Sequence, residues 1–313
     1  MNKILFLYTD QSEKADLILA ADAVRTVLRK FRKNAVFSFV SIDLSLPCRS
    51  KLKKILSDIT SDTGCLMFCG SKNTLSEELR LFSECFNTNS AQYFSSGKCI
   101  CYPLTLYSAE KSDICIKENS NTDICAIEKA VSLSLKEAKQ RKELLLCTNT
   151  EKETDRLIYS EFINTMADTQ GISVEHFDLD EMIYSLTEKL PSCNVILTTQ
   201  NKARIIAIHI SSLNKFPTGY TVFHGEKLKI YKKEIFPYGD FSNIPYASFL
   251  IACGTMLEKE LGYKNAGMHL RKMAARTLEK CCFESRTDFQ KNLLIEINKP
   301  LRHREGKTNE GDN

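Results

Sequence analysis

The sequence predicts an α/β fold in which a mixed, largely parallel sheet is flanked by helices. Short apolar runs such as KILFLY, at residues 3–8, alternate with longer segments whose apolar residues recur at a helical period. Strands and helices that take turns in this way form mainly parallel sheets. The chain has 313 residues, 43% of them hydrophobic and 26% charged, which is enough for one large domain or two smaller ones.

The first third of the chain is predicted to run strand, helix, strand, helix, strand, helix. In this order, the elements cover residues 3–8, 14–31, 35–42, 51–59, 64–70 and 75–86. The helix over 14–31 is amphipathic, and the helix over 51–59 is basic. A buried strand is also expected within GKCICYPL, residues 97–104, where two cysteines alternate with other residues.

The remainder continues the alternation as far as residue 213. Strands are predicted at residues 113–118, 143–148, 172–177 and 194–199, with helices over 126–141, 154–169, from Asp180, and from about 200 to 213. Two helices then follow, over 245–262 and 265–281, and Gly262 is expected to end the first of them. The polar residues after 297 are expected to form a flexible tail.

Composition excludes several classes of function. A formal net charge of +4, with basic residues spread along the chain, gives little support to nucleic-acid binding. No apolar run reaches the roughly 18–20 residues of a membrane span, so we expect no membrane association and a cytoplasmic protein. The 13 cysteines include no CxxC pair, which favours reduced thiols over disulfides or a structural zinc site.

The first strand-to-helix loop lacks the glycines of a nucleotide site. It reads YTDQSEKAD, and Gly64 is the first glycine of the chain. Dinucleotide-binding and P-loop motifs need glycines so that backbone amides can approach the phosphates. The sequence therefore excludes a standard Rossmann or P-loop site here.

Five segments resemble motifs of one enzyme family and occur in the same order. They are IKENSN, ETDRLIYSEF, VEHFDLDEM, NVILTTQN and IPYASFLIACGTMLEKELG. Together they resemble the isocitrate and isopropylmalate dehydrogenases, which are metal-dependent decarboxylating dehydrogenases of 2-hydroxy acids. The resemblance implies an isopropylmalate dehydrogenase-like two-domain fold. Residues 1–97 with 218–297 would form the nucleotide-side domain, residues 98–217 the dimerisation domain, and 298–313 the tail.

The family's metal ligands are mostly replaced. Two aspartates on the helix after the Thr-Glu-Asn turn correspond to Arg204 and Ile208, and a third, donated by the neighbouring subunit, corresponds to Asp180. Mg²⁺ and Mn²⁺ require oxygen ligands, and a guanidinium repels them. The resemblance thus implies that Asp180 remains without a metal, although Asp180 could instead cap a helix and Arg204 could be a solvated surface residue.

The family's catalytic groups are also missing. Its proton-relaying lysine corresponds to Thr148, which has no titratable nitrogen and cannot act as a general base. The segment that would carry the catalytic tyrosine is shortened to SNTDICAIEKAV and contains none.

Parts of the substrate and cofactor sites are kept. The family binds substrate carboxylates with three arginines: Arg80 matches the first, Ser90 replaces the second and Lys117 stands for the third. The two remaining cations could still bind a small carboxylate. Alternatively, both are ordinary surface charges. For the cofactor site, the resemblance implies four candidate residues. These are Asp10, His224, Gly225 and Asn243. Two of them, His224 and Gly225, would also suit an ordinary turn.

The resemblance also implies an oligomer. The helices from about Thr154 and Asn201 match the family's intersubunit helices and keep apolar side chains: Leu157, Ile158 and Phe162 on one, Ile205, Ile206, Ile210 and Leu213 on the other. We therefore expect a catalytically inactive dehydrogenase-like protein without a cofactor, acting as a binding or regulatory subunit in a homodimer or a hetero-oligomer with a paralogue. The alternative is a metal-free NAD- or NADP-dependent oxidoreductase of a small 2-hydroxy acid.

Overall fold

A computed structural model gives the arrangement of most of the chain. It describes residues 3–8, 11–41, 65–69, 88–97, 102–109, 121–149, 153–165, 170–188, 195–213, 218–225, 229–233 and 243–300. Several predictions lie outside the described residues: the helices over 51–59 and 75–86, the strand over 113–118, and the tail from residue 301.

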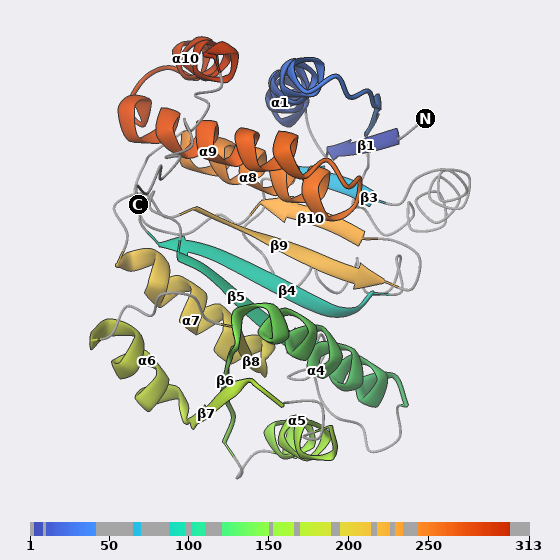
Figure 1. Cartoon of the computed structure of the whole chain (residues 1–313), viewed down its shortest axis with the longest axis vertical. Helices are drawn as coiled ribbons and strands as arrows, with labels where there is room; N and C mark the ends of the chain where they lie inside the picture. The colour runs from blue at the N-terminus through green and yellow to red at the C-terminus, as the bar shows by residue number, and fades with distance from the viewer. Residues whose placement is uncertain are drawn as a thin grey trace, which may run out of the picture.

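Figure 1 shows the helices and strands of the structure, and most of those that were predicted lie within a few residues of their expected bounds. The strand expected within 97–104 is not among them, because residues 98–101 lie outside the described residues. The first group comprises β1 (Lys3–Tyr8), α1 (Gln11–Lys30), β2 (Val36–Ser41), β3 (Cys65–Cys69), β4 (Thr88–Gly97) and β5 (Tyr102–Ala109). The second comprises α4 (Asn121–Arg141), β6 (Glu143–Cys147), α5 (Glu153–Asn164), β7 (Ser173–Phe177), α6 (Leu179–Glu188), β8 (Val195–Thr199) and α7 (Gln200–Ser212). The last comprises β9 (Thr218–Gly225), β10 (Lys229–Lys233), α8 (Asn243–Lys259), α9 (Lys264–Cys281) and α10 (Arg286–Asn298).

All described strands belong to one mixed sheet, with the order β2-β1-β3-β10-β9-β4-β5-β8-β6-β7. The outer strands pair in parallel on both sides, whereas β10, β9, β4 and β5 pair antiparallel in the middle. The parallel strand β1 is an unbroken apolar run and is buried from Ile4 to Tyr8, as expected when helices or loops cover both faces. The predicted largely parallel α/β fold is therefore confirmed.

Three strands and one helix have no counterpart in the pattern of the sequence. β4 reads TNSAQYFSSG, which has few apolar residues, and its place in the sheet comes from pairing with β5 and β9. β9 and β10 form a hairpin across a segment for which the alternation predicts no strand. α10 begins at the cap Ser285, whose hydroxyl accepts from the backbone amide of Asp288 at 3.1 Å.

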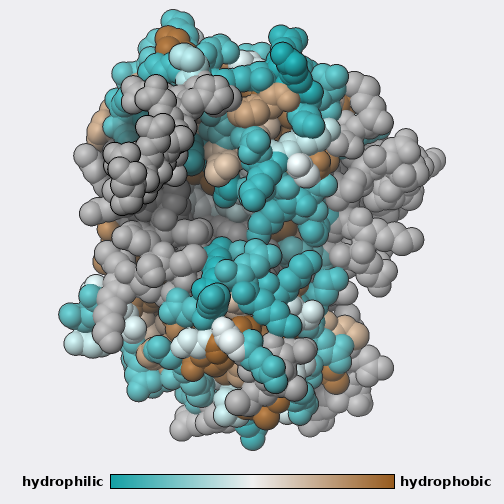
Figure 2. Space-filling model, in the orientation of Figure 1, coloured by the Kyte–Doolittle hydropathy of each residue, from teal (hydrophilic) through white to brown (hydrophobic). Residues whose placement is uncertain are grey.

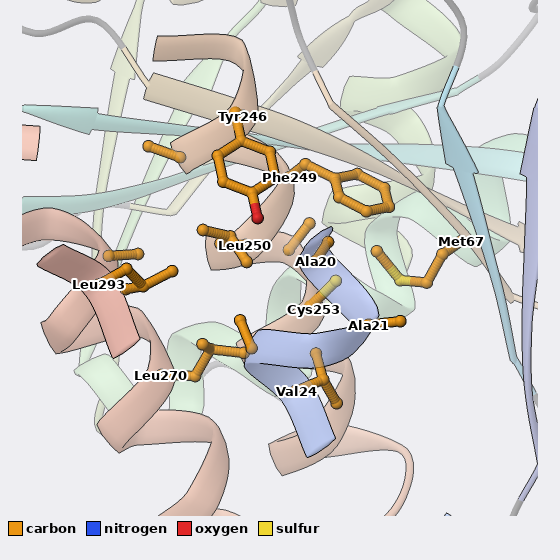
Figure 3. Packing of buried hydrophobic residues seen from close by; sticks show 14 of the residues in the cluster. Ala20, Ala21, Val24, Met67, Tyr246, Phe249, Leu250, Cys253, Leu270 and Leu293 are labelled. Atoms are coloured by element: carbon orange, nitrogen blue, oxygen red, sulfur yellow. The ribbon is translucent and has the colours of Figure 1, made fainter. Parts of the chain in front are cut away.

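The first hydrophobic core lies between the β1 side of the sheet and helices α1, α8, α9 and α10. Figure 3 shows side chains of α8, including Tyr246, Phe249 and Leu250, packed against Ala20 and Val24 of α1. Gly262 has a positive φ of 69° and follows the end of α8, so the predicted helix stop is confirmed. The next helix, α9, then folds back onto α8.

The second core lies between α4, α5 and the strands β6 and β8. Figure 2 shows that hydrophilic residues cover much of the surface on this side of the molecule, whereas Ala130, Val131 and Leu135 of α4 are buried. From β6 the chain passes through α5 to β7 at the edge of the sheet, and from β7 it returns through α6 to β8, in the opposite direction. Because parallel crossovers are right-handed, two crossovers in opposite directions place α5 and α6 on opposite faces of the sheet. Consistently, α5 packs against α4, whereas α7 packs against α6.

This arrangement buries four of the seven apolar side chains that were expected at an intersubunit face, while the oligomer itself stays a prediction. Ile158 and Phe162 of α5 and Ile206 and Ile210 of α7 are buried within the chain itself, so they cannot contact a second subunit. Leu157, Ile205 and Leu213 stay exposed, but α5 and α7 lie on different faces of the sheet. The spacing of apolar residues could not distinguish burial inside the chain from contact with a second subunit, because a helix has one apolar stripe in both situations.

The two cores share one continuous sheet, and the division into residues 1–97 with 218–297 and 98–217 stays a prediction. Among the described helices, none combines the length and apolar character needed to span a bilayer.

Candidate functional site

Buried polar side chains gather where β6 and β8 end. The carboxyl ends of neighbouring parallel strands lie at one edge of the sheet, which is where ligands bind in many open α/β folds. Thr148 and Thr198 are both buried at this edge. The Thr198 hydroxyl donates to the carbonyl of Cys147 at 2.6 Å, which fixes the two strand ends to each other.

A buried ion pair joins the helices that leave this edge. The Lys202 ammonium on α7 donates to Asp155 Oδ2 on α5 at 2.7 Å, with side-chain exposures of 8% and 0%. The Asn149 backbone amide donates to the same oxygen at 3.0 Å. Asp155 Oδ1 is buried and has no hydrogen-bond partner among the described residues. Because α5 and α7 cover opposite faces of the sheet, the ion pair between Lys202 and Asp155 joins these two helices beyond the carboxyl ends of β6 and β8.

Thr148 occupies the position that the resemblance gives to the catalytic lysine. Its hydroxyl lies 2.7 Å from Nε2 of His176 on the edge strand β7, and the His176 ring stacks on Tyr159 at 5.3 Å. Beside it, burial raises the pKa of the Cys147 thiol to about 11. A buried hydroxyl and a neutral thiol do not supply the general base that the family's lysine provides.

Arg204 and Ile208 lie on one side of α7, as predicted, at the positions that the resemblance gives to two metal ligands. Arg204 is exposed and Ile208 is half-buried, while Asp180 is exposed in the first turn of α6. A guanidinium and an aliphatic side chain offer no lone pair to Mg²⁺ or Mn²⁺, so this donor set does not fit a divalent cation. No cluster of three His, Cys, Asp or Glu side chains suited to a metal occurs among the described residues.

The start of α6 corrects one interpretation of Asp180. Asp178 caps the helix: its Oδ1 accepts from the Glu181 amide at 2.8 Å, and Glu181 Oε2 accepts from the Asp178 amide at 3.1 Å. This reciprocal pair is a capping box. Asp180 therefore lies inside the first turn and is not the cap.

Two of the cofactor candidates, His224 and Asn243, lie inside the protein. His224 is 6% exposed near the end of β9, opposite Lys229 of β10, and Gly225 is the last residue of that strand. Burial, with smaller effects from Lys229, Lys129 and Lys259, lowers the pKa of His224 to about 3. The ring is therefore neutral near pH 7, with little surface available to an adenine.

Asn243 is likewise engaged within the fold. It is fully buried at the start of α8, and its Nδ2 donates to the carbonyl of Glu284 at 2.8 Å and to that of Cys281 at 3.2 Å. These contacts tie the start of α8 to the end of α9 and leave the amide nitrogen committed to structure. Neither the buried ring of His224 nor the Asn243 amide nitrogen is therefore placed to contact a nucleotide, and the absence of a cofactor stays a prediction. Asp10, Arg80 and Lys117 lie outside the described residues.

The burial of His224 predicts a pH-dependent stability. The unfolded chain takes up a proton at this residue below about pH 6.5, whereas the folded chain does so only near its lowered pKa, so stability falls as the pH falls. Between about pH 7.5 and about pH 5 the unfolding free energy should lose about 2 kcal/mol through this group. Urea unfolding of the wild type and of His224→Gln at both pH values measures it. Parallel pH profiles for the two proteins would contradict the assignment.

The sequence analysis did not predict the buried ion pair between Asp155 and Lys202, although the sequence indicates that both residues are buried. Asp155 shares the helical stripe of Ile158 and Phe162, and Lys202 shares that of Ile206 and Ile210. A charged residue that continues an apolar stripe is a candidate for a buried, paired charge.

The structural comparisons identify the fold. A crystal structure of isocitrate dehydrogenase from Methylococcus capsulatus matches with a TM-score of 0.75 at 11% identity, covering 95% of this chain and 99% of that one. The chain has the fold of isocitrate dehydrogenase. The TT0538 protein from Thermus thermophilus also matches with a TM-score of 0.75, at 14% identity over 96% of this chain and 69% of that one. No protein-family model and no curated protein matches the sequence.

At these identities the match concerns the backbone. The resemblance drawn from the five motifs is thus confirmed for the isocitrate dehydrogenase fold. The residue roles carried over from the family, and the loss of activity they imply, stay predictions.

Proposed function

We propose that this chain is a non-catalytic protein with the isocitrate dehydrogenase fold, which acts as a binding or regulatory subunit. The observation that carries the proposal is the side of α7 that presents Arg204 and Ile208, where the family resemblance expects two metal-binding carboxylates. Oxidative decarboxylation in that family depends on the cation to stabilise negative charge on the substrate oxygens. A fixed guanidinium can attract a carboxylate, but it cannot hold the cation that this chemistry needs.

The carboxyl edge supports the same proposal. Thr148 lacks the nitrogen of a catalytic lysine, and its hydroxyl is engaged with His176. Lys202, a buried amine in the first turn of α7, is paired with Asp155 and therefore does not supply a free base. The edge is thus built to hold α5 and α7 in place rather than to move a proton.

We further propose that the chain assembles through the exposed apolar side of α6 and α7. Tyr184 of α6 is 68% exposed, and Ile205 and Leu213 of α7 are 47% and 39% exposed. The two helices are held together by a 2.9 Å hydrogen bond between Thr187 and His209. Burying three such side chains against a second copy or a paralogue stabilises an interface by about 1.5–3 kcal/mol each. Sedimentation equilibrium of the purified chain is expected to give twice the monomer mass.

A direct activity measurement tests the proposal. Purified protein is incubated with isocitrate, isopropylmalate or tartrate, with NAD or NADP and with Mn²⁺ present or absent. We expect no reduction of the nicotinamide above the rate without protein, because the metal ligands and the base are absent. Turnover that disappears in Arg80→Ala would overturn the proposal. If that turnover does not need Mn²⁺, it would establish the alternative metal-free oxidoreductase.

A further inference from the structure

The end of α1 and the outer side of α9 form a basic ridge. It consists of Arg29, Arg32 and Lys33 from the α1 end and Lys272 and Arg276 from α9, and all five side chains are exposed. α1, α9 and α10 pack together at one end of the molecule (Figure 1). The ridge is therefore a product of helix packing, because its two parts are more than 200 residues apart in the sequence.

Contacts between the helices place the two parts side by side. Lys30 Nζ lies 3.4 Å from His269 Nε2 of α9, and the Phe31 ring lies against the same histidine at 5.5 Å. Burial, together with the charges of Lys30, Arg276 and Lys272, lowers the pKa of His269. The α9 cations thus act on the residue that α1 touches.

The five ridge cations are not neutralised within the described part of the chain. None of them forms an ion pair there, whereas the nearby Lys280 and Lys299 both pair with Glu296. Basic residues in and just after the last turn of α1 complement its helix dipole, but this does not account for Lys272 and Arg276, which lie well before the end of α9. On α1 and α9, the exposed acidic residues closest in sequence to the ridge are Asp22, seven positions before Arg29, and Glu279, three positions after Arg276.

The shape of the ridge fits an extended chain. Lys33 covers the ring of Tyr263, just before α9, at 5.5 Å, and Arg276 lies 13 positions further along. At a helical rise of 1.5 Å per residue, this stretch is roughly 20 Å long. About six residues of extended polypeptide span the same length.

The residues in and around the ridge favour a protein partner over a nucleic acid or a lipid surface. Phe31 lies against His269, and Lys33 covers Tyr263, so neither ring is free to stack on a base. None of the large exposed hydrophobic side chains of the described residues belongs to the ridge, which gives it nothing to insert into a lipid surface. We propose that this ridge binds an extended acidic segment of a partner protein. The inference is independent of the function proposed above, since it would hold for an active enzyme as well.

Binding of a labelled hexaglutamate peptide, followed by fluorescence anisotropy at low and physiological salt, tests the proposal. The wild type is expected to bind at low salt and more weakly when salt screens the charges. The triple variant Arg29→Glu, Lys272→Glu, Arg276→Glu should bind at least about tenfold more weakly, because three exposed charge pairs are lost. A matched control, Lys136→Glu, Lys139→Glu, Arg156→Glu on α4 and α5, changes the net charge equally and should bind as the wild type does.

Three results would overturn the proposal. The first is no binding of hexaglutamate by the wild type at low salt. The second is an equal loss in the ridge and control variants, which would mean that net charge alone matters. The third is tighter binding of hexathymidylate or of phosphatidylserine vesicles than of hexaglutamate. If the triple variant does not fold, Lys272→Gln with Arg276→Gln removes two charges at exposed helix positions and is tested in its place.

Discussion

Replacing Gly267 with alanine is expected to destabilise the fold by about 2–4 kcal/mol, because helix packing leaves no room for a methyl group. A Cβ at this position would lie 2.2 Å from the carbonyl oxygen of Gly254 and 2.9 Å from the backbone nitrogen of Glu258. Both atoms belong to the backbone of α8, so no side-chain rotation relieves the clash. The two helices would have to separate at the centre of the first core.

Thermal and urea unfolding measure this effect. Gly254→Ala should act similarly, since its Cβ would lie 2.7 Å from the Gly267 carbonyl oxygen. The double variant should lose less than the sum, because both methyl groups force the same separation. Glu279→Ala, at an exposed position of α9, is the control and should change the unfolding free energy by less than about 0.5 kcal/mol. An unchanged melting temperature in Gly267→Ala would show that α8 and α9 do not approach so closely.

Replacing Lys202 with methionine is expected to cost about 3–5 kcal/mol of stability, since it leaves the charge of Asp155 buried and unpaired. Asp155 is fully buried, and without the ammonium its carboxylate would keep only the Asn149 amide as a donor among the described residues. The loss should appear as a lower urea midpoint in unfolding experiments.

The double variant Lys202→Met, Asp155→Asn separates loss of the ion pair from loss of packing. It removes both charges and should recover most of the lost stability, since no charge is then left buried. Lys291→Met is the surface control: its ion pair with Asp288 has side-chain exposures of 69% and 52%, and the change should be within about 0.5 kcal/mol. If the double variant is as unstable as Lys202→Met, the methionine rather than the unpaired carboxylate causes the loss.

Much of the fold could be predicted because local patterns agreed with it. β1, β6 and β8 are short apolar runs, α1 and α9 have one clear apolar stripe, and Gly262 supplies the positive φ that ends a helix. β4 carries no such pattern, because its polar sequence is held in the sheet by two neighbouring strands. β9 and β10 were missed for a different reason: the His-Gly pair also suits a turn, and it lies at the end of a strand.

The candidate site could be predicted only in part. Motif order alone assigned Thr148, Arg204 and Ile208 to the catalytic and metal-binding positions of the family that the five segments resemble, and these assignments stay predictions. Asp155 and Lys202 belong to different motifs, 47 residues apart, and nothing local indicates that they meet. His224 and Asn243 match residue types of the family that the five segments resemble, but their burial within the fold could not be seen in the sequence.

The sequence by itself determined the alternation of strands and helices, the stop at Gly262, and the presence at residues 204 and 208 of side chains without an oxygen ligand, since each depends on residue type and short-range spacing. The tertiary structure alone decided which apolar helix stripes are buried inside the chain, which charges are buried together where β6 and β8 end, and which basic residues form a ridge. These outcomes depend on crossover handedness and helix packing, which bring distant segments together, and a one-dimensional pattern does not specify such distances.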